Sequence, residues 1–380
     1  MVLPRLRRMH RMPGSLSMTE RRGIGFGRRG DTPAAPTGGG LDERSWPDGV
    51  PKLDEDTAIA LLPKRPPRGH KGSFGKLLVI AGSLDYAGAA LLVCRGAGRA
   101  GVGLVTLAVP ETLQPLFAAK VVEATTMALP EDDVEEIDPE PALARILDHD
   151  HDAIVVGPGL RPGLSTAELV RDLIDPGGEE RPPILLDAEA LRSLASMDGW
   201  WDGERRAAVL TPHAGEFSRL RVGSGIDAAA DGDLIDDDAA RVAAAKDAAA
   251  TWHQVVVLKG ARTVIAAPDG EVAMAPFENP ALASGGTGDV LAGAIGSLLA
   301  QGLSPFGAAR LGVYLHGLAG DGARERFGDA GVLAGDLPEG LAIARRRLAA
   351  IAERQTTDKR LGFRVREPTE APQDADAARA

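Results

Sequence analysis

Three glycines and an aspartate, in the segment Gly285-Gly286-Thr287-Gly288-Asp289, precede a long apolar run. The run predicts a helix, and the segment would form the N-terminus of that helix. Glycines let backbone N–H groups converge because no Cβ stands in the way, and N–H groups at a helix N-terminus bind anions. We therefore predict an anion hole at Gly286, Thr287 and Gly288 that stabilises a phosphoryl group during its transfer.

Asp289 completes this segment and could supply a base. A carboxylate beside a phosphoryl-transfer site can accept a proton from a substrate hydroxyl. The structural alternative is a capping aspartate, which would stabilise the helix by ~1 kcal/mol. Because glycines are so dense immediately before it, the chemical role is favoured, and we predict that Asp289 is the catalytic residue.

Glycines and polar residues also follow five short apolar runs that predict strands. The segments are Gly82-Ser83, Gly157-Pro158-Gly159, Asp187, Thr211-Pro212-His213-Ala214-Gly215-Glu216 and Lys259-Gly260. Any one of them alone could be a turn. The carboxyl ends of parallel strands meet at one edge of a sheet, however, and ligands bind there. Together these segments predict one ligand-binding crevice.

Residues 52–356 alternate between short apolar runs and helical stretches. Continuous apolar runs are typical of strands that are buried on both faces of a parallel sheet. The predicted strands are Leu77–Ala81, Leu104–Val109, Ala153–Val156, Ile184–Leu186, Ala208–Leu210 and Val255–Leu258. The predicted helices are Ala89–Ala100, Pro141–Leu147, Thr166–Ile174, Asp238–Trp252, Asp289–Ala300 and Pro305–Phe327. This order predicts an α/β fold in which helix layers cover both faces of a mostly parallel central sheet.

Two local patterns need separate interpretation. Pro268-Asp269-Gly270 predicts the tight turn of a hairpin between Arg262–Ala267 and Glu271–Pro276. The segment 96–101 matches the G-x-G-x-x-G pattern of dinucleotide-binding loops. Such a loop must follow a strand and open a helix, whereas this segment follows a helix and precedes a strand. We reject it as a binding loop and predict that its glycines allow close helix packing and a turn.

Composition excludes several classes of protein. The 380 residues are 44% hydrophobic and 26% charged, which is ordinary for a globular chain. The net charge of −11 argues against a nucleic-acid-binding surface, and no apolar run reaches the ~18 residues of a membrane-spanning helix. The single cysteine, Cys94, excludes an internal disulfide and lies among apolar residues. We expect a buried thiol in a cytoplasmic protein.

Both ends of the chain differ from its middle. Residues 1–51 are rich in arginine, glycine and proline, and residues 357–380 are rich in alanine, proline and charged residues. Neither segment carries enough apolar surface to offset the entropy of ordering it. We predict two disordered segments that flank one catalytic domain at residues 52–356. The alternative for the first segment is a basic arm that binds a polyanion.

Several motifs, taken in this order, resemble the ADP-dependent (S)-NAD(P)H-hydrate dehydratases, a family related to carbohydrate kinases. They are His70–Lys76, Ala81-Gly82-Ser83, Gly157–Leu160, Leu186-Asp187-Ala188, Thr211–Phe217, Val257–Gly260, Gly285–Asp289 and Tyr314–Gly317. The resemblance implies a ribokinase-like three-layer α/β/α sandwich. It also implies a lyase with ADP as co-substrate and Mg²⁺ as cofactor, which returns (6S)-NADHX and NADPHX to NADH and NADPH with release of AMP and phosphate.

The resemblance assigns roles to matching positions. The hydrate substrate would contact Ala89, Gly159, His213 and Asp289. The nucleotide, ADP or AMP, would contact Lys259, Gly260, Ala261, Arg262, Thr263 and Gly288. Glu216 would contact Mg²⁺ indirectly, through water, because Mg²⁺ prefers carboxylate and phosphate oxygens and retains several waters.

The chain also departs from its family. Many members have Asn-Gln where this chain has Ala261-Arg262, so Arg262 would either add charge near the nucleotide or face solvent. Some members carry an upstream epimerase domain. Residues 1–51 are too short for one, so we expect a separate epimerase. The family implies a homo-oligomer, often a tetramer, that acts on small molecules, with no nucleic-acid or membrane partner.

Some interpretations stay open. Asp187 could equally be a site residue or the cap of a strand end, and a packed histidine is favoured over a site role for His316. A vitamin-precursor kinase that uses ATP is an alternative function, although such kinases tend to have Asn at the position of His213, and some have Cys at that of Asp289. A catalytically silent nucleotide sensor is a second alternative.

Overall fold

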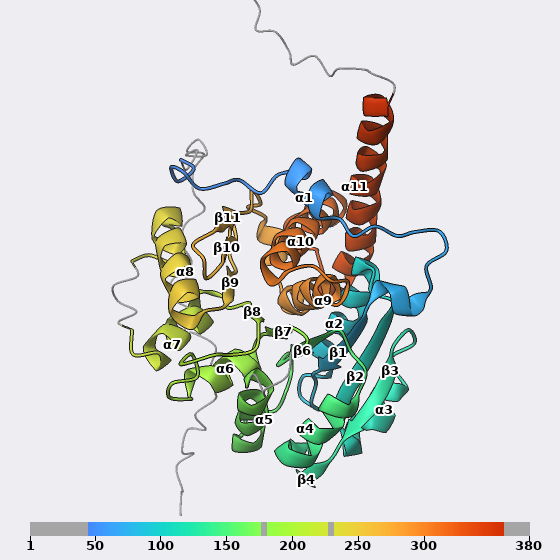
Figure 1. The fold of residues 1–380 in the computed structure, drawn as a ribbon, viewed down its shortest axis with the longest axis vertical. Coiled ribbons are helices and arrows are strands. Elements are labelled where there is room, and N and C mark those ends of the chain that lie inside the picture. Colours follow the sequence, from blue (N-terminus) through green and yellow to red (C-terminus); the bar gives the residue numbers. More distant parts are fainter. Residues whose placement is uncertain (1–44, 176–180, 227–231, 361–380) are drawn as a thin grey trace, which may run out of the picture. The chain divides into compact units, whose positions relative to one another are not determined.

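The structure is a computed structural model that describes residues 45–175, 181–226 and 232–360. Within the compact unit that begins at Trp46, the described residues form one nine-stranded sheet with the order β11-β10-β9-β8-β7-β6-β1-β2-β3, shown in Figure 1. The neighbouring strands β3, β2, β1, β6, β7, β8 and β9 pair in parallel, and β10 pairs antiparallel with both β9 and β11. The strands are β1 (Lys76–Ile80), β2 (Leu104–Pro110), β3 (Thr125–Leu129), β6 (Ala153–Val156), β7 (Ile184–Leu186), β8 (Ala208–Leu210), β9 (Val255–Leu258), β10 (Val264–Ala266) and β11 (Val272–Met274). A separate small ribbon pairs β4 (Glu131–Asp133) with β5 (Glu136–Ile137).

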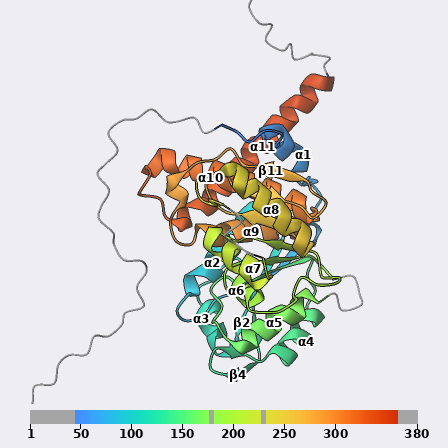
Figure 2. The ribbon, with the colours of Figure 1, turned by 90° about the vertical axis from the view of Figure 1, so that its left-hand side faces the viewer.

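Helices cover both faces of the sheet. In strand β1, Leu77 and Val79 join one apolar core, whereas Leu78 and Ile80 join another. This alternation follows from the strand period of two, which sends successive side chains to opposite faces. Helices of the first layer are α1 (Glu55–Leu61), α2 (Ala87–Ala100), α3 (Gln114–Ala118), α9 (Thr287–Ala300), α10 (Pro305–Phe327) and α11 (Leu337–Arg360). Helices of the second layer are α4 (Pro139–Asp148), α5 (Leu164–Ile174), α6 (Glu189–Ala195), α7 (Ala214–Gly223) and α8 (Asp238–Trp252), several of which lie toward the viewer in Figure 2. The three-layer prediction is confirmed.

The inner strands match their predictions closely. Four predicted strands have the observed bounds, and the other two differ by a residue at one or both ends. The prediction missed the edge strand β3, whose first residues Thr125 and Thr126 are not buried and break the apolar pattern. It also missed the ribbon β4–β5 and the helices α1, α3, α6, α7 and α11. Short or strongly charged helices carry a weak apolar period, and that period is the main signal in a sequence.

The predicted domain boundaries shift at both ends. Residues 45–51 are described, and Trp46 and Val50 pack against the core on the α8 side of the sheet. Helix α11 continues to Arg360, past the predicted boundary at residue 356. The remaining parts of the two predicted disordered segments, residues 1–44 and 361–380, lie outside the described residues.

Helices α2 and α9 lie unusually close together. A Cβ at Gly96 would lie 2.6 Å from the carbonyl oxygen of Val290, and one at Gly293 would lie 2.2 Å from that of Val93. Gly96 is in the rejected G-x-G-x-x-G pattern, so the prediction of close helix packing is confirmed. Cys94 of α2 is buried, which confirms the expectation of a buried thiol, and burial raises the pKa of this thiol to about 12. Across the described ranges, no helix has the length and apolar character needed to span a bilayer.

Candidate active site

The carboxyl ends of β7, β8 and β9 meet the N-terminus of α9. Beyond β8 and β9 the sheet pairing continues, because His213 forms a parallel bridge with Lys259 and the Lys259 N–H donates to the Pro212 carbonyl at 2.8 Å. A Cβ at Gly288, in the first turn of α9, would lie 3.5 Å from Lys259 Nζ. The ammonium group of Lys259 therefore lies at the helix N-terminus, as the predicted crevice requires.

Lys259 is the centre of a cluster of carboxylates. Its Nζ donates to Asp187 Oδ1 at 2.8 Å and lies 3.8 Å from Glu216 Oε2. Burial alone would lower the pKa of Lys259, but the carboxylates of Asp187, Glu216 and Asp289 outweigh burial and raise it. Lys259 therefore stays charged, and the open question about Asp187 is answered in favour of a place in this cluster.

Asp289 lies in the first turn of α9 beside this cluster. Burial raises the pKa of its carboxyl to about 7, repulsion from Asp187 adds to that rise, and attraction to Lys259 partly opposes it. A carboxyl with this pKa exchanges a proton readily at neutral pH, as a general base must.

His213 and Glu216 form the cap of α7. The Nδ1 atom of His213 accepts from the N–H of Gly215 at 3.1 Å, and Glu216 Oε2 accepts from the N–H of His213 at 2.9 Å. This reciprocal capping box satisfies N–H groups that the helix itself cannot. It also fixes the orientation of both side chains at the ends of β8 and β9.

Two cavities adjoin the cluster and share His213. The larger has a volume of about 750 Å³, and the smaller one of about 240 Å³. Of the predicted nucleotide and anion-hole residues, the larger cavity is lined by Lys259, Gly260, Ala261, Thr263, Thr287 and Gly288. Of the predicted substrate and metal residues, the smaller cavity is lined by Gly159, His213 and Glu216. A Cβ at Gly159 would lie 3.0 Å from that of Ala89, so Ala89 lies beside the smaller cavity.

Residues 77–342 match the family described as NAD(P)H-hydrate dehydratase. The chain belongs to this family. It is 42% identical to the bifunctional NAD(P)H-hydrate repair enzyme of Moorella thermoacetica over 290 residues, which cover 76% of this chain and 52% of that protein. It is 36% identical to the corresponding Escherichia coli enzyme over 303 residues, which cover 78% of this chain and 53% of that protein. The chain thus spans about half the length of the curated relatives it matches.

A solved structure agrees with this assignment to the dehydratase family. The ADP/ATP-dependent NAD(P)H-hydrate dehydratase of Bacillus subtilis, co-crystallised with ATP and Mg²⁺, superposes with a TM-score of 0.66 at 33% identity. The match covers 80% of this chain and all of that one. The fold is therefore ribokinase-like, as in the Bacillus subtilis dehydratase, and the vitamin-kinase alternative is not favoured.

Arg262 of this dehydratase-family chain pairs with two carboxylates rather than facing solvent. Its side chain neither lines the larger cavity nor faces solvent, because it reaches Asp238 at 3.1 Å and also pairs with Glu278. Glu278 itself lines the cavity. The positive charge of Arg262 is thus compensated by two carboxylates, one of which belongs to the cavity wall.

The residues predicted to form the anion hole make up the turn that begins α9. Gly286 has φ +90°, and a Cβ there would lie 2.6 Å from Leu92 Cδ1, so this position requires glycine. The N–H of Thr287 is directed at the Ser284 carbonyl at 3.4 Å, and the Thr287 hydroxyl donates to Leu282 and Ser284 carbonyls. Thr287 therefore shapes the turn, and the amide of Gly288 is the better placed of the two for an anion.

Sequence reasoning missed several residues of the larger cavity. Phe277, Asn279 and Ser284 line it, and they follow the hairpin rather than a strand of the parallel sheet. Asn279, the chain's only asparagine, was the one compositional signal available. His316 is buried as expected and burial lowers its pKa to about 4, yet it also lines this cavity. Its Nε2 lies 3.0 Å from the Thr287 carbonyl, which ties α10 to the start of α9.

Proposed function

We propose that this chain catalyses the ADP-dependent dehydration of (6S)-NADHX and NADPHX to NADH and NADPH, with release of AMP and phosphate. The observation that carries the proposal is the cluster of Asp187, Lys259 and Asp289, in which Asp289 has a pKa of about 7. A charged lysine and a poised base beside a cavity of nucleotide size suit phosphoryl transfer to a substrate hydroxyl.

The proposed chemistry converts a poor leaving group into a good one. Hydroxide leaves the hydrated nicotinamide ring with difficulty, whereas phosphate, with a second pKa of ~6, leaves readily. Asp289 accepts the proton of the ring hydroxyl while the oxygen of that hydroxyl attacks the β-phosphorus of ADP. The bond between this phosphorus and the oxygen that remains on AMP breaks. The ring C–O bond then breaks with release of phosphate, a proton is lost from the neighbouring ring carbon, and the C=C bond that forms restores the dihydronicotinamide. The larger cavity would hold ADP and the smaller one the hydrated ring.

Mg²⁺ would assist phosphoryl transfer by binding the diphosphate of ADP. In the described parts of the chain, no three His, Cys, Asp or Glu side chains gather as a metal site. Glu216 is largely buried at the smaller cavity, and its Oε2 already accepts from the His213 N–H. This donor set suits a cation held mainly by phosphate oxygens and water, with Glu216 as an indirect ligand. When bound, Mg²⁺ supplies charge neutralisation of the diphosphate.

The partners remain part of the proposal. Relatives of about twice this chain's matched length are named bifunctional repair enzymes, and we propose that an epimerase activity supplies the S hydrate to this site. We also propose that the protein assembles as a homo-oligomer, as the family resemblance implies.

A spectroscopic assay tests the proposal. Purified protein is mixed with NADH hydrate, Mg²⁺ and either ADP or ATP, and the dihydronicotinamide band near ~340 nm is followed. Growth of this band with ADP, with AMP as the product, supports the repair reaction. No growth with either nucleotide, from protein that binds ADP, would refute it, and formation of ADP from ATP on a vitamin precursor would favour the kinase instead.

A further inference from the structure

A buried arginine lies behind the nucleotide loop Lys259–Thr263. Arg241, near the start of α8, is only 1% exposed. Its guanidinium donates to the carbonyls of Leu258 at 3.2 Å and Arg262 at 3.3 Å, and also to that of Ala261. Two carbonyls of this loop and the carbonyl of Leu258, the last residue of β9, thus converge on one side chain, as the several N–H donors of a guanidinium allow.

The loop adopts a backbone conformation that needs such support. Arg262 has φ +50°, in the left-handed region that non-glycine residues rarely adopt. Gly260 has φ +154°, and a Cβ there would lie 2.8 Å from Arg241 Nη2. The guanidinium therefore lies so close to the loop that a side chain at position 260 would have to displace it.

The carbonyl directions determine where the loop amides point. In a trans peptide the N–H lies opposite the C=O, and the described residues contain no cis peptide bond. Because the Arg262 carbonyl faces Arg241, the N–H of Thr263 points away from Arg241. Thr263 lines the larger cavity, so the arginine determines how this part of the loop presents its donors.

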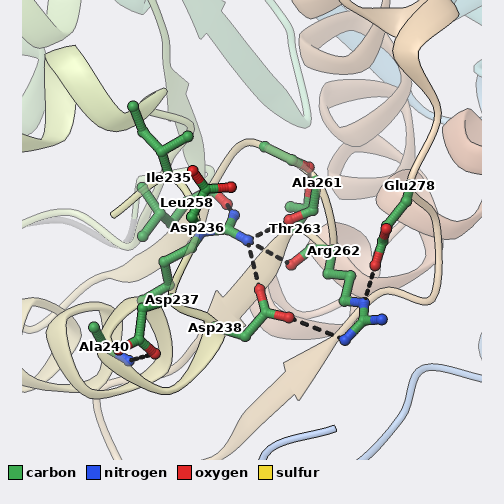
Figure 3. A network of polar contacts seen from close by, with 12 residues as sticks. Ile235, Asp236, Asp237, Asp238, Ala240, Leu258, Ala261, Arg262, Thr263 and Glu278 are labelled. Atoms are coloured by element: carbon green, nitrogen blue, oxygen red, sulfur yellow. Dashed lines mark hydrogen bonds and ion pairs between the residues drawn. The ribbon is translucent and has the colours of Figure 1, made fainter. Parts of the chain in front are cut away.

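Asp238 extends this support to the other wall of the cavity. One of its carboxylate oxygens accepts from Arg241 at 3.2 Å and the other from Arg262 at 3.1 Å. Arg262 in turn pairs with Glu278, and Figure 3 shows this side chain between the carboxylates of Asp238 and Glu278. Because Glu278 lines the larger cavity, one polar network links the nucleotide loop to the segment that faces it.

We propose that Arg241 and Asp238 are positioning residues of the nucleotide pocket, which hold the loop Lys259–Thr263 in the shape that binds the diphosphate of ADP without touching it. This inference rests on the proposed function, because it assigns the larger cavity to ADP. The competing interpretation is that the network only stabilises the fold.

The experiment compares Arg241→Gln with a matched control, Arg206→Gln. Arg206 is also buried and donates to backbone carbonyls, those of Pro182 and Leu173, but it lies at the amino end of β7, away from the pocket. Melting temperature, the Kd of ADP by calorimetry, and kcat and KM for each substrate are measured for both. We expect both variants to melt lower, while only Arg241→Gln raises the Kd and KM of ADP, by about tenfold or more. The KM for the hydrate and kcat at saturating ADP should change little.

Two further variants keep the test decisive if Arg241→Gln fails to fold. Arg241→Lys should raise the Kd of ADP above that of the wild type, because lysine keeps the charge but lacks the planar fork. Asp238→Asn should also raise the KM of ADP above that of the wild type. Unchanged ADP affinity in these variants, or an equal loss in Arg206→Gln, would overturn the inference. A wild-type protein that binds no ADP would instead overturn the proposed function.

Discussion

The surroundings of Asp289 give its carboxyl the pKa that a general base needs at neutral pH. Its carboxyl is partly buried at a helix N-terminus and close to both Asp187 and Lys259. We predict that Asp289→Asn lowers kcat by at least ~100-fold, because an amide of the same size cannot accept the hydroxyl proton. Affinity for ADP should stay within a few-fold of the wild type. Initial rates and calorimetry measure the two quantities, and a kcat near that of the wild type would remove Asp289 as the base.

The pKa of Asp289 also predicts a pH dependence of activity. A base with a pKa of about 7 is mostly protonated at pH 6 and mostly ionised at pH 8. We therefore expect kcat/KM for the hydrate to rise through neutral pH and then level off, because this ratio reports the pKa values of the free enzyme. The measurement is kcat/KM for the hydrate between pH 5.5 and 8.5 (~0.5-unit steps suffice for one titration). A flat profile would show that another group, or another step, limits turnover.

The same pKa predicts a change in stability, whose sign follows from linkage. Folding raises the pKa of Asp289 above its ordinary value of 3.8, so the folded state holds this proton more tightly than the unfolded chain. The resulting stability is present below pH 3.8 and is lost as pH rises through about 7. The free energy of unfolding of Asp289→Asn, measured relative to that of the wild type, should therefore be larger at pH 8 than at pH 4. Urea unfolding at both values tests this, and a constant difference would contradict it.

At the scale of elements, the contact between α2 and α9 holds Asp289 in place. A Cβ at Gly96 would lie 2.6 Å from the backbone carbonyl of Val290, directly after Asp289, and backbone cannot yield as a flexible side chain can. We predict that Gly96→Ala destabilises the protein by about 1–3 kcal/mol and lowers kcat by displacing the start of α9. The control is Gly98→Ala in the same helix, which meets nothing within 4 Å. It should stabilise the protein by about 0.5–1 kcal/mol, and equal effects of the two variants would refute the argument.

At the scale of the whole molecule, the segment before α1 belongs to the sheet. Lys52 bridges to Met274 of β11, the Leu53 N–H donates to the Met274 carbonyl at 2.9 Å, and Pro51 accepts from the Met274 N–H at 3.0 Å. This segment pairs along the edge strand, and unpaired edges are prone to aggregate. We predict that deletion of residues 1–44 leaves kcat and melting temperature unchanged. Deletion of residues 1–53 should cost about 2–3 kcal/mol, because Leu53 is fully buried, and an unfolding titration of both truncations measures the difference.

Much of the fold could be predicted because parallel strands are buried on both faces. Runs such as Ile184–Leu186 and Val255–Leu258 are continuous and apolar, and the structure has them with the same bounds. The edge strand β3 and the charged helix α11 could not be found in this way. One face of each meets water, so tertiary contacts rather than hydrophobic pattern determine where they begin and end.

The candidate site, like the fold, could be predicted from the sequence only in part. The sequence by itself indicated part of the crevice, because residues that follow neighbouring parallel strands meet at the carboxyl edge of the sheet. Only the tertiary structure decided that His213 caps a helix, that Arg262 pairs with Asp238, and that Arg241 supports the loop from behind. It also decided the pKa of Asp289. These properties depend on burial and on partners from distant parts of the chain, and both arise only when the helix layers pack on the sheet.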